Sequence, residues 1–157
     1  MTNLKVMRVA ACAATLCAVL MGPVAGASAS SASIKAAIRS YNSKILVAEG
    51  HVVTALGEYK TSKNPAGVQT ALGASISVIR SLKDKIALQS AGRPRVKRAK
   101  AKIEKGLQAV IASYQGLDNA FGEKSVNPEE AKAEATKALA AVKKGRKELL
   151  EGAKLLR

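Results

Sequence analysis

From about residue 32 onward, apolar residues recur at spacings of three and four, which is the pattern of one buried helix face. Proline, glycine and asparagine divide this pattern into segments of about 32–61, 65–90, 94–122 and 128–156. Each segment therefore predicts one long amphipathic helix. The apolar positions of the four segments are Ile34, Ile38, Tyr41, Ile45, Ala48, Val52, Ala55 and Tyr59; Val68, Leu72, Ile76, Ile79, Leu82 and Ile86; Val96, Ile103, Leu107, Val110, Tyr114, Leu117 and Phe121; and Ala131, Ala135, Ala138, Leu139, Val142, Leu149, Ala153 and Leu156.

The residues between these segments carry helix start and stop signals. Asn64 and Asn127 each precede a proline, which is the order of an N-cap residue followed by the first helical residue. Glu130, three residues after Asn127, completes a capping box. Gly92 predicts a C′ glycine that ends the second helix, and Pro94 predicts the start of the third.

Short connections force consecutive helices to run antiparallel. We therefore predict an all-α fold over residues 30–157, an up-down-up-down antiparallel four-helix bundle. In the fourth segment, Gly145 and Gly152 lie in line with Ala138 and Ala131. Glycine inside a helix costs about 1 kcal/mol relative to alanine, so we expect these glycines to allow a close approach of a neighbouring helix.

The first 27 residues have the pattern of a secretory signal peptide. Lys5 and Arg8 precede an apolar run at positions 9–20, and a glycine–proline pair follows it. Two overlapping Ala-x-Ala motifs then place the cleavage near residue 27 or 29. The run is shorter than the roughly 20 residues of a membrane-spanning helix. We therefore predict that residues 1–27 are removed and that the protein is secreted or extracytoplasmic.

Removal of this segment changes the chemistry that remains. Cys12 and Cys17 are the only cysteines, and all three methionines also lie before residue 28. The mature chain would have no thiol, so disulfide, redox and thiolate–metal chemistry are excluded. Loss of Lys5 and Arg8 lowers the net charge from +15 to +13.

Residues that could carry catalysis or hold a metal are scarce. His51, the only histidine, lies at the edge of the first apolar face. Haem-binding and di-iron helical bundles need several His, Met or Glu-x-x-His ligands, which this chain does not offer. Glu130 and Glu134 belong to the first turns of a helix, where acidic residues complement the dipole. We therefore expect no enzyme, no cofactor, no metal site and no small-molecule substrate.

Charge is the most distinctive property of the chain. In the predicted bundle, the half that contains the starts of the first and third helices has a net charge of +15, and the other half has −2. A helix dipole favours basic residues at the C-terminus of the helix and disfavours them at its N-terminus. It therefore does not explain Arg93–Lys105, where seven of thirteen residues are basic at an N-terminus. We therefore predict an anion-binding surface, with a merely solubilising role as the alternative. Its residues are Arg93, Arg95, Lys97, Arg98, Lys100, Lys102, Lys105, Lys143, Lys144, Arg146 and Lys147.

These features predict a secreted, non-catalytic protein whose cationic end contacts anionic envelope polymers or an anionic membrane surface through lipid headgroups. One alternative is an extracellular nucleic-acid binder of histone-like composition, and another is a structural module that docks an acidic protein. All four aromatic residues fall on the apolar faces, which argues against recognition by base or sugar stacking. The pattern specifies no oligomeric state.

Overall fold

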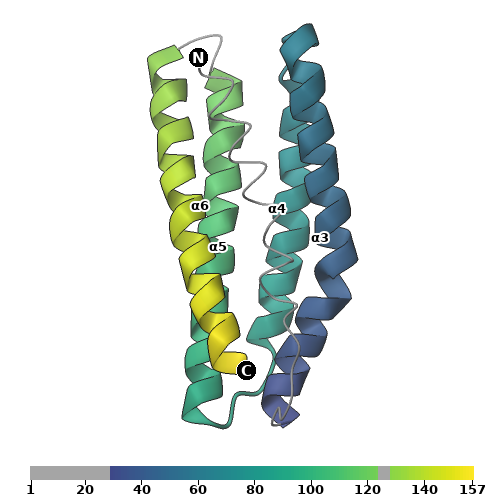
Figure 1. Cartoon of the computed structure of the whole chain (residues 1–157). Helices are drawn as coiled ribbons and strands as arrows, with labels where there is room; N and C mark the ends of the chain where they lie inside the picture. Colours follow the sequence, from purple (N-terminus) through teal and green to yellow (C-terminus); the bar gives the residue numbers. More distant parts are fainter. Residues whose placement is uncertain (1–28, 124–127) are drawn as a thin grey trace.

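The computed structural model describes residues 29–123 and 128–157, and all regular secondary structure in this part of the chain is helical. Figure 1 shows the helices side by side, with α5 and α6 on one side of the molecule and α3 and α4 on the other. The predicted all-helical class with four helices is confirmed. The expected signal peptide, with Cys12 and Cys17, lies outside the described residues. The helices are α3 (Ala29–Ser62), α4 (Ala66–Ala87), α5 (Pro94–Glu123) and α6 (Pro128–Leu156).

The helices pack mainly in chain order, α3 on α4, α4 on α5, and α5 on α6. Near its C-terminal end, α6 lies against the beginning of α5, where Gly152 faces Ala99 and Ile103. The beginning of α5 also reaches the end of α4, since Lys100 donates hydrogen bonds to the carbonyl oxygen of Ala87. Contacts from distant parts of the sequence therefore gather at this end of the molecule.

The apolar faces predicted from the sequence form the core. Every apolar position predicted above whose side chain is described is buried, except Tyr41 and Ala153, which are half-buried. Full burial of one Leu or Ile side chain stabilises the fold by about 1.5–3 kcal/mol, so these faces supply the main driving force for packing. Tyr59 and Phe121 tie α3 to α5 by an edge-to-face contact, with ring centroids 5.0 Å apart.

The junction of α3 and α4 follows the predicted signals. Lys63 closes α3 in the left-handed conformation, with φ 58°, and its N–H donates to the carbonyl of Tyr59 at 3.0 Å. The Asn64 side chain accepts a hydrogen bond from the N–H of Ala66 at 3.0 Å, as an N-cap asparagine does. Pro65 already has helical angles. The predicted capping hydrogen bond of Asn64 is therefore present, although α4 itself begins at Ala66, one residue later than predicted.

The other two helix starts were also predicted. α5 begins at Pro94 and α6 at Pro128. Asn127 lies outside the described residues, as does the side chain of Glu130, so the predicted capping box stays a prediction.

The predicted role of Gly92 is wrong. α4 ends at Ala87 with Leu88 as its C-cap, so Gly92 lies five positions beyond the helix and is not its C′ residue. The apolar face stops at Ile86, and Leu88 is 85% exposed, so further helical turns would bury nothing. Lys100 of α5 binds the freed carbonyls of Ala87 and Gln89 instead.

The expected close approach of α5 and α6 is confirmed. A Cβ atom on Gly145 would lie 2.9 Å from the carbonyl oxygen of Gly106, and one on Gly152 would lie 2.6 Å from Cγ1 of Ile103. Gly106 was not predicted to take part. It belongs to a series of buried small residues at seven-residue spacing along α5, formed by Ala99, Gly106, Ser113 and Ala120.

Candidate anion-binding surface

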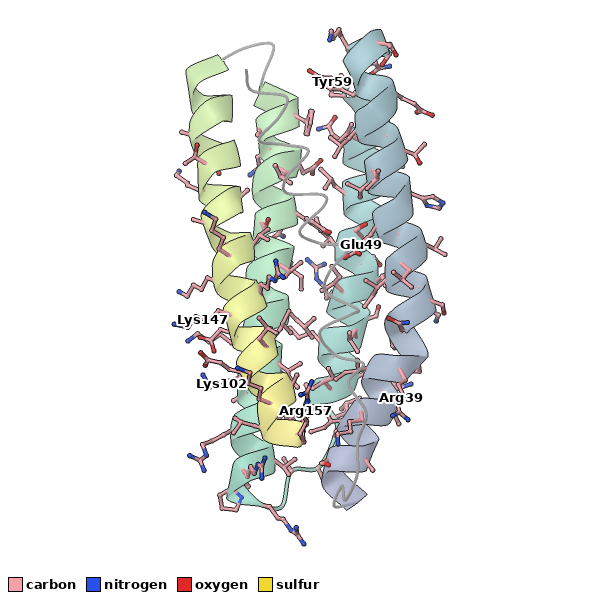
Figure 2. All side chains as sticks on the ribbon, in the orientation of Figure 1. Arg39, Glu49, Tyr59, Lys102, Lys147 and Arg157 are labelled. Atoms are coloured by element: carbon pink, nitrogen blue, oxygen red, sulfur yellow. The ribbon has the colours of Figure 1, made fainter. Side chains whose placement is uncertain are left out.

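The predicted anion-binding residues come from the first half of α5 and the second half of α6. Gly152 of α6 packs against Ala99 and Ile103, whereas Gly145 packs against Ala109 and Val110. Residues 143–147 therefore lie beside the middle of α5, and the two sets together extend from the start of α5 to about its middle. Figure 2 shows Lys102 and Lys147 at the outer side of this helix pair, whereas Arg39 lies on α3 across the molecule. The eleven residues do not share one role, since four of them have partners within the protein.

Arg95 and Lys100 bind carbonyl groups at the ends of neighbouring helices. Arg95 Nε donates to the carbonyl of Leu155 at 2.9 Å, in the last turn of α6. Lys100 Nζ donates to the carbonyl of Gln89 at 2.8 Å, just beyond α4. Helix C-termini carry partial negative charge, so cations at the start of α5 are stabilised by the ends of α4 and α6. Sequence reasoning missed this role because it weighed each cation only against the dipole of its own helix.

Lys102 and Lys105 form ion pairs with two acidic residues of α6. Lys102 Nζ lies 3.2 Å from Glu148 and also contacts Glu151, and Lys105 Nζ lies 2.9 Å from Glu148. Hydrogen bonds to Glu151 and then to Glu148 raise the pKa of Lys102. Hydrogen bonds from Lys105 and Lys102 lower the pKa of Glu148, and the bond from Lys102 lowers that of Glu151. The charges of these two lysines are therefore partly balanced inside the α5–α6 pair.

The remaining seven residues are all exposed. Within residues 29–123 and 128–157, none of them forms an ion pair, so their charge faces solvent without a bound carboxylate. We call these residues the basic surface. They are Arg93, Lys97, Arg98, Lys143, Lys144, Arg146 and Lys147.

Cations on the α3–α4 side have a different environment. Lys44 and Lys85 lie over the half-buried ring of Tyr41, with Nζ atoms 5.1 and 5.7 Å from its centroid. Burial lowers the pKa of Lys35, and the charge of Arg39 lowers it further. These cations are spread along α3 and α4 and do not extend the basic surface.

Glu49 is a buried ionisable residue that sequence reasoning did not single out. It is 3% exposed, at mid-height of the molecule in Figure 2, and neither carboxylate oxygen has a hydrogen-bond partner within the described part of the chain. Burial raises the pKa of Glu49 to about 8. Its position was readable, because it lies four residues after Ile45 and three before Val52, both on the inner face of α3.

The described residues give little evidence of metal binding or of a membrane-spanning helix. In this part of the chain, no group of three or more His, Cys, Asp or Glu side chains is placed so that it could hold a metal ion. His51 is exposed on α3. None of the helices that the structure describes combines the length and apolarity needed to cross a membrane.

Comparison with protein-family models, with curated proteins and with solved structures found no match to this chain. Its function is therefore argued from the geometry and charge described above.

Proposed function

We propose that the chain is exported by its first 27 residues and that the mature part, an up-down-up-down antiparallel bundle, binds a polyanion without catalysing a reaction. The observation that carries the proposal is the basic surface, with six exposed cations from α5 and α6 and Arg93 just before α5, none of which forms an ion pair in the described part of the chain. A surface of one sign attracts polyanions over several ångströms and raises their local concentration.

Recognition would depend on charge density and not on ring stacking. Tyr59, Tyr114 and Phe121 are at most 7% exposed, and the half-buried ring of Tyr41 is covered by Lys44 and Lys85, so the described aromatic residues offer no open platform for a base or a sugar ring. Lysine offers a flexible point charge and arginine a planar fork that matches phosphate and carboxylate, so the four lysines and three arginines of the basic surface suit a polymer of repeated anionic groups. Export favours envelope polymers and anionic lipid headgroups over the cell's own chromosome.

The test is a variant of the basic surface that leaves its internally bonded neighbours intact. Arg98→Gln, Lys144→Gln and Lys147→Gln remove three exposed charges and none of the bonds made by Arg95, Lys100, Lys102 or Lys105. We expect this triple variant to bind weaker than the original chain at low salt. For duplex DNA, the slope of log affinity against log salt should flatten by about 0.9 for each phosphate that the variant no longer neutralises.

The matched control removes two exposed charges from the α3–α4 side, by Arg39→Gln and Arg80→Gln, and is compared with the double variant Arg98→Gln, Lys144→Gln. Lys85 is kept, because it lies over the ring of Tyr41. At physiological salt, charges more than about 8–10 Å from a bound polyanion are largely screened, so the control should lose much less affinity. Equal losses in the two variants would contradict a localised site.

Three probes separate the classes of partner. Binding of the chain to duplex DNA, to vesicles containing phosphatidylglycerol and to purified teichoic acid is measured across a salt series. Preference for teichoic acid or vesicles would support an envelope partner, and preference for DNA would support the nucleic-acid alternative. Absence of binding to all three at low salt would overturn the proposal and leave the basic surface with a solubilising role.

A further inference from the structure

The solvent side of the second half of α6 combines cations with one leucine. Between residues 143 and 157, every exposed residue is basic except Leu150, which is 37% exposed. A single exposed apolar side chain is ordinary on a protein surface. What sets Leu150 apart is that its neighbours on the surface of the helix are cations.

The cations lie at the spacings that share a helix face with Leu150. Arg146, Lys147 and Lys154 are three or four residues away from it, and Lys143 is seven residues before it. At about 100° per residue, all four lie within about 60° of Leu150 around the helix axis. They extend over about 16 Å along α6. We call this set, together with the residue that follows the helix, the α6 outer face: Lys143, Arg146, Lys147, Leu150, Lys154 and Arg157.

The packing of α6 turns its acidic side chains away from this face. Glu148 and Glu151 are the acidic residues between positions 143 and 157, and both bind lysines of α5. Glu151 attracts Lys147, but no cation of the α6 outer face forms an ion pair within residues 29–123 and 128–157. The two glycines of α6 that touch α5 lie on the opposite side of the helix from Leu150. In Figure 1, α6 lies at the edge of the molecule, so the face is open to solvent.

We propose that the α6 outer face binds the surface of a bilayer that contains anionic phospholipids, with Leu150 below the level of the phosphate groups. This inference rests on the proposed function and names the partner of the cations that α6 provides. The argument for this partner is complementarity of charge and of polarity. Clusters of about four to eight basic residues on a helix bind anionic headgroups, and an apolar side chain among them reaches the acyl boundary beneath.

The leucine distinguishes a bilayer from a soluble polymer. A polymer of repeated phosphate, carboxylate or sulfate groups offers Leu150 nothing apolar to contact, so the leucine would only interrupt the cations. At a bilayer, the acyl chains begin just below the phosphates. The stems of lysine and arginine can lie along Leu150 while their charged ends stay at the phosphates. Because the cations follow the helix axis, α6 would lie parallel to the bilayer.

Attachment through this face should be reversible and should weaken with salt. Each cation near an anionic bilayer strengthens binding by about fivefold, and one partly exposed leucine adds only a few-fold more. We therefore expect the chain to attach through α6 to vesicles that contain phosphatidylglycerol. Vesicles of phosphatidylcholine alone should not bind this face at physiological salt.

A single tryptophan at position 150 tests the insertion, because the chain contains no tryptophan of its own. The emission of Leu150→Trp should shift to the blue on vesicles that contain phosphatidylglycerol, and brominated acyl chains should quench it. The emission reports position 150 itself, so attachment through another part of the chain would leave it unshifted. Leu88→Trp is the matched control, since Leu88 is 85% exposed and follows α4, and its emission should not change.

Two further variants separate the contributions of polarity and charge. Leu150→Ser should weaken attachment to these vesicles by about three- to tenfold and leave the affinities for duplex DNA and teichoic acid unchanged. Arg146→Gln combined with Lys154→Gln should weaken attachment by about 25-fold, the product of two fivefold losses.

The possible outcomes separate this inference from the proposed function. Attachment to the vesicles with unshifted emission at position 150, or attachment that Leu150→Ser does not weaken, would overturn the bilayer inference. Binding to DNA or teichoic acid but not to the vesicles would also overturn it and would leave the proposed polyanion binding intact. Absence of binding to all three at low salt would overturn both.

Discussion

Burial of the Glu49 carboxyl group makes the stability of this fold depend on pH. Its folded-state pKa of about 8 lies above the ordinary value of 4.5, so the folded protein holds the proton more tightly than the unfolded chain does. Its contribution to stability is therefore fully present below about pH 4.5 and is lost as the pH rises through 8. Ionisation of this carboxyl group therefore weakens the fold in alkaline solution.

Glu49→Gln should remove this pH dependence. The variant should match the original chain near pH 4 and be more stable at pH 9 by roughly 2–5 kcal/mol, the value of a shift of a few pKa units. Denaturant unfolding at several pH values measures the difference. Glu58→Gln is the control, because Glu58 is exposed on the same helix, and its difference from the original chain should not follow this pH course. A pH-independent effect of Glu49→Gln would show that the carboxyl group is not held protonated.

At the scale of elements, the close packing of α5 against α6 depends on glycines at the contact, which have no side-chain atoms to hold the helices apart. Gly106→Ala gains about 1 kcal/mol of helix propensity. The new Cβ would lie 2.5 Å from Cγ of Leu149 and 2.9 Å from the carbonyl oxygen of Gly145. Backbone atoms cannot move aside without separating the helices, so overpacking of about 1–3 kcal/mol should outweigh the gain.

The same substitution at an open position should have the opposite sign. A Cβ on Gly73 of α4 would meet nothing within 4 Å, and Gly73 is exposed. Gly73→Ala should therefore stabilise the protein by about 0.5–1 kcal/mol. Thermal unfolding of both variants gives the comparison. Stabilisation by Gly106→Ala would show that α5 and α6 are not packed as closely as described.

The elements could be predicted because each is encoded locally. Three- and four-residue spacing marks the buried faces, and Asn64, Pro94 and Pro128 mark helix boundaries, so chain-local rules suffice. The role of Gly92 was mispredicted because this glycine resembles a stop signal, although the apolar face had already stopped at Ile86. A local signal outweighed the pattern of burial in that prediction.

The candidate site was less accessible to sequence reasoning, because it depends on which helix ends meet. The charge excess and its place on α5 and α6 were readable. The contacts of Lys100 with the end of α4 and of Arg95 with Leu155 were not, since each joins two different helices and depends on how those helices pack. The packing thus divides the basic residues into two groups. One group binds carbonyl groups at helix ends or carboxylates of α6, and the other faces solvent.

At the scale of the whole molecule, the basic surface should make stability depend on salt. Its seven cations form no ion pair, and apart from the attraction of Lys147 to Glu151 they repel one another when the helices come together. The ion pairs of Lys102 and Lys105 act in the opposite direction, but only a few such pairs occur on this end of the described chain, and exposed pairs contribute about 0–1 kcal/mol each. Repulsion should therefore dominate at low salt.

Added sodium chloride should then raise the melting temperature, because it screens the repulsion. The Arg98→Gln, Lys144→Gln and Lys147→Gln variant should melt higher than the original chain at low salt and should respond less to added salt. The two proteins should converge as the screening length falls to about 3 Å near 1 M salt. Calorimetry of both proteins in the same buffers cancels the general effect of salt on apolar burial. If the original chain loses stability as salt is added, its ion pairs outweigh the repulsion, and the basic surface does not strain the fold.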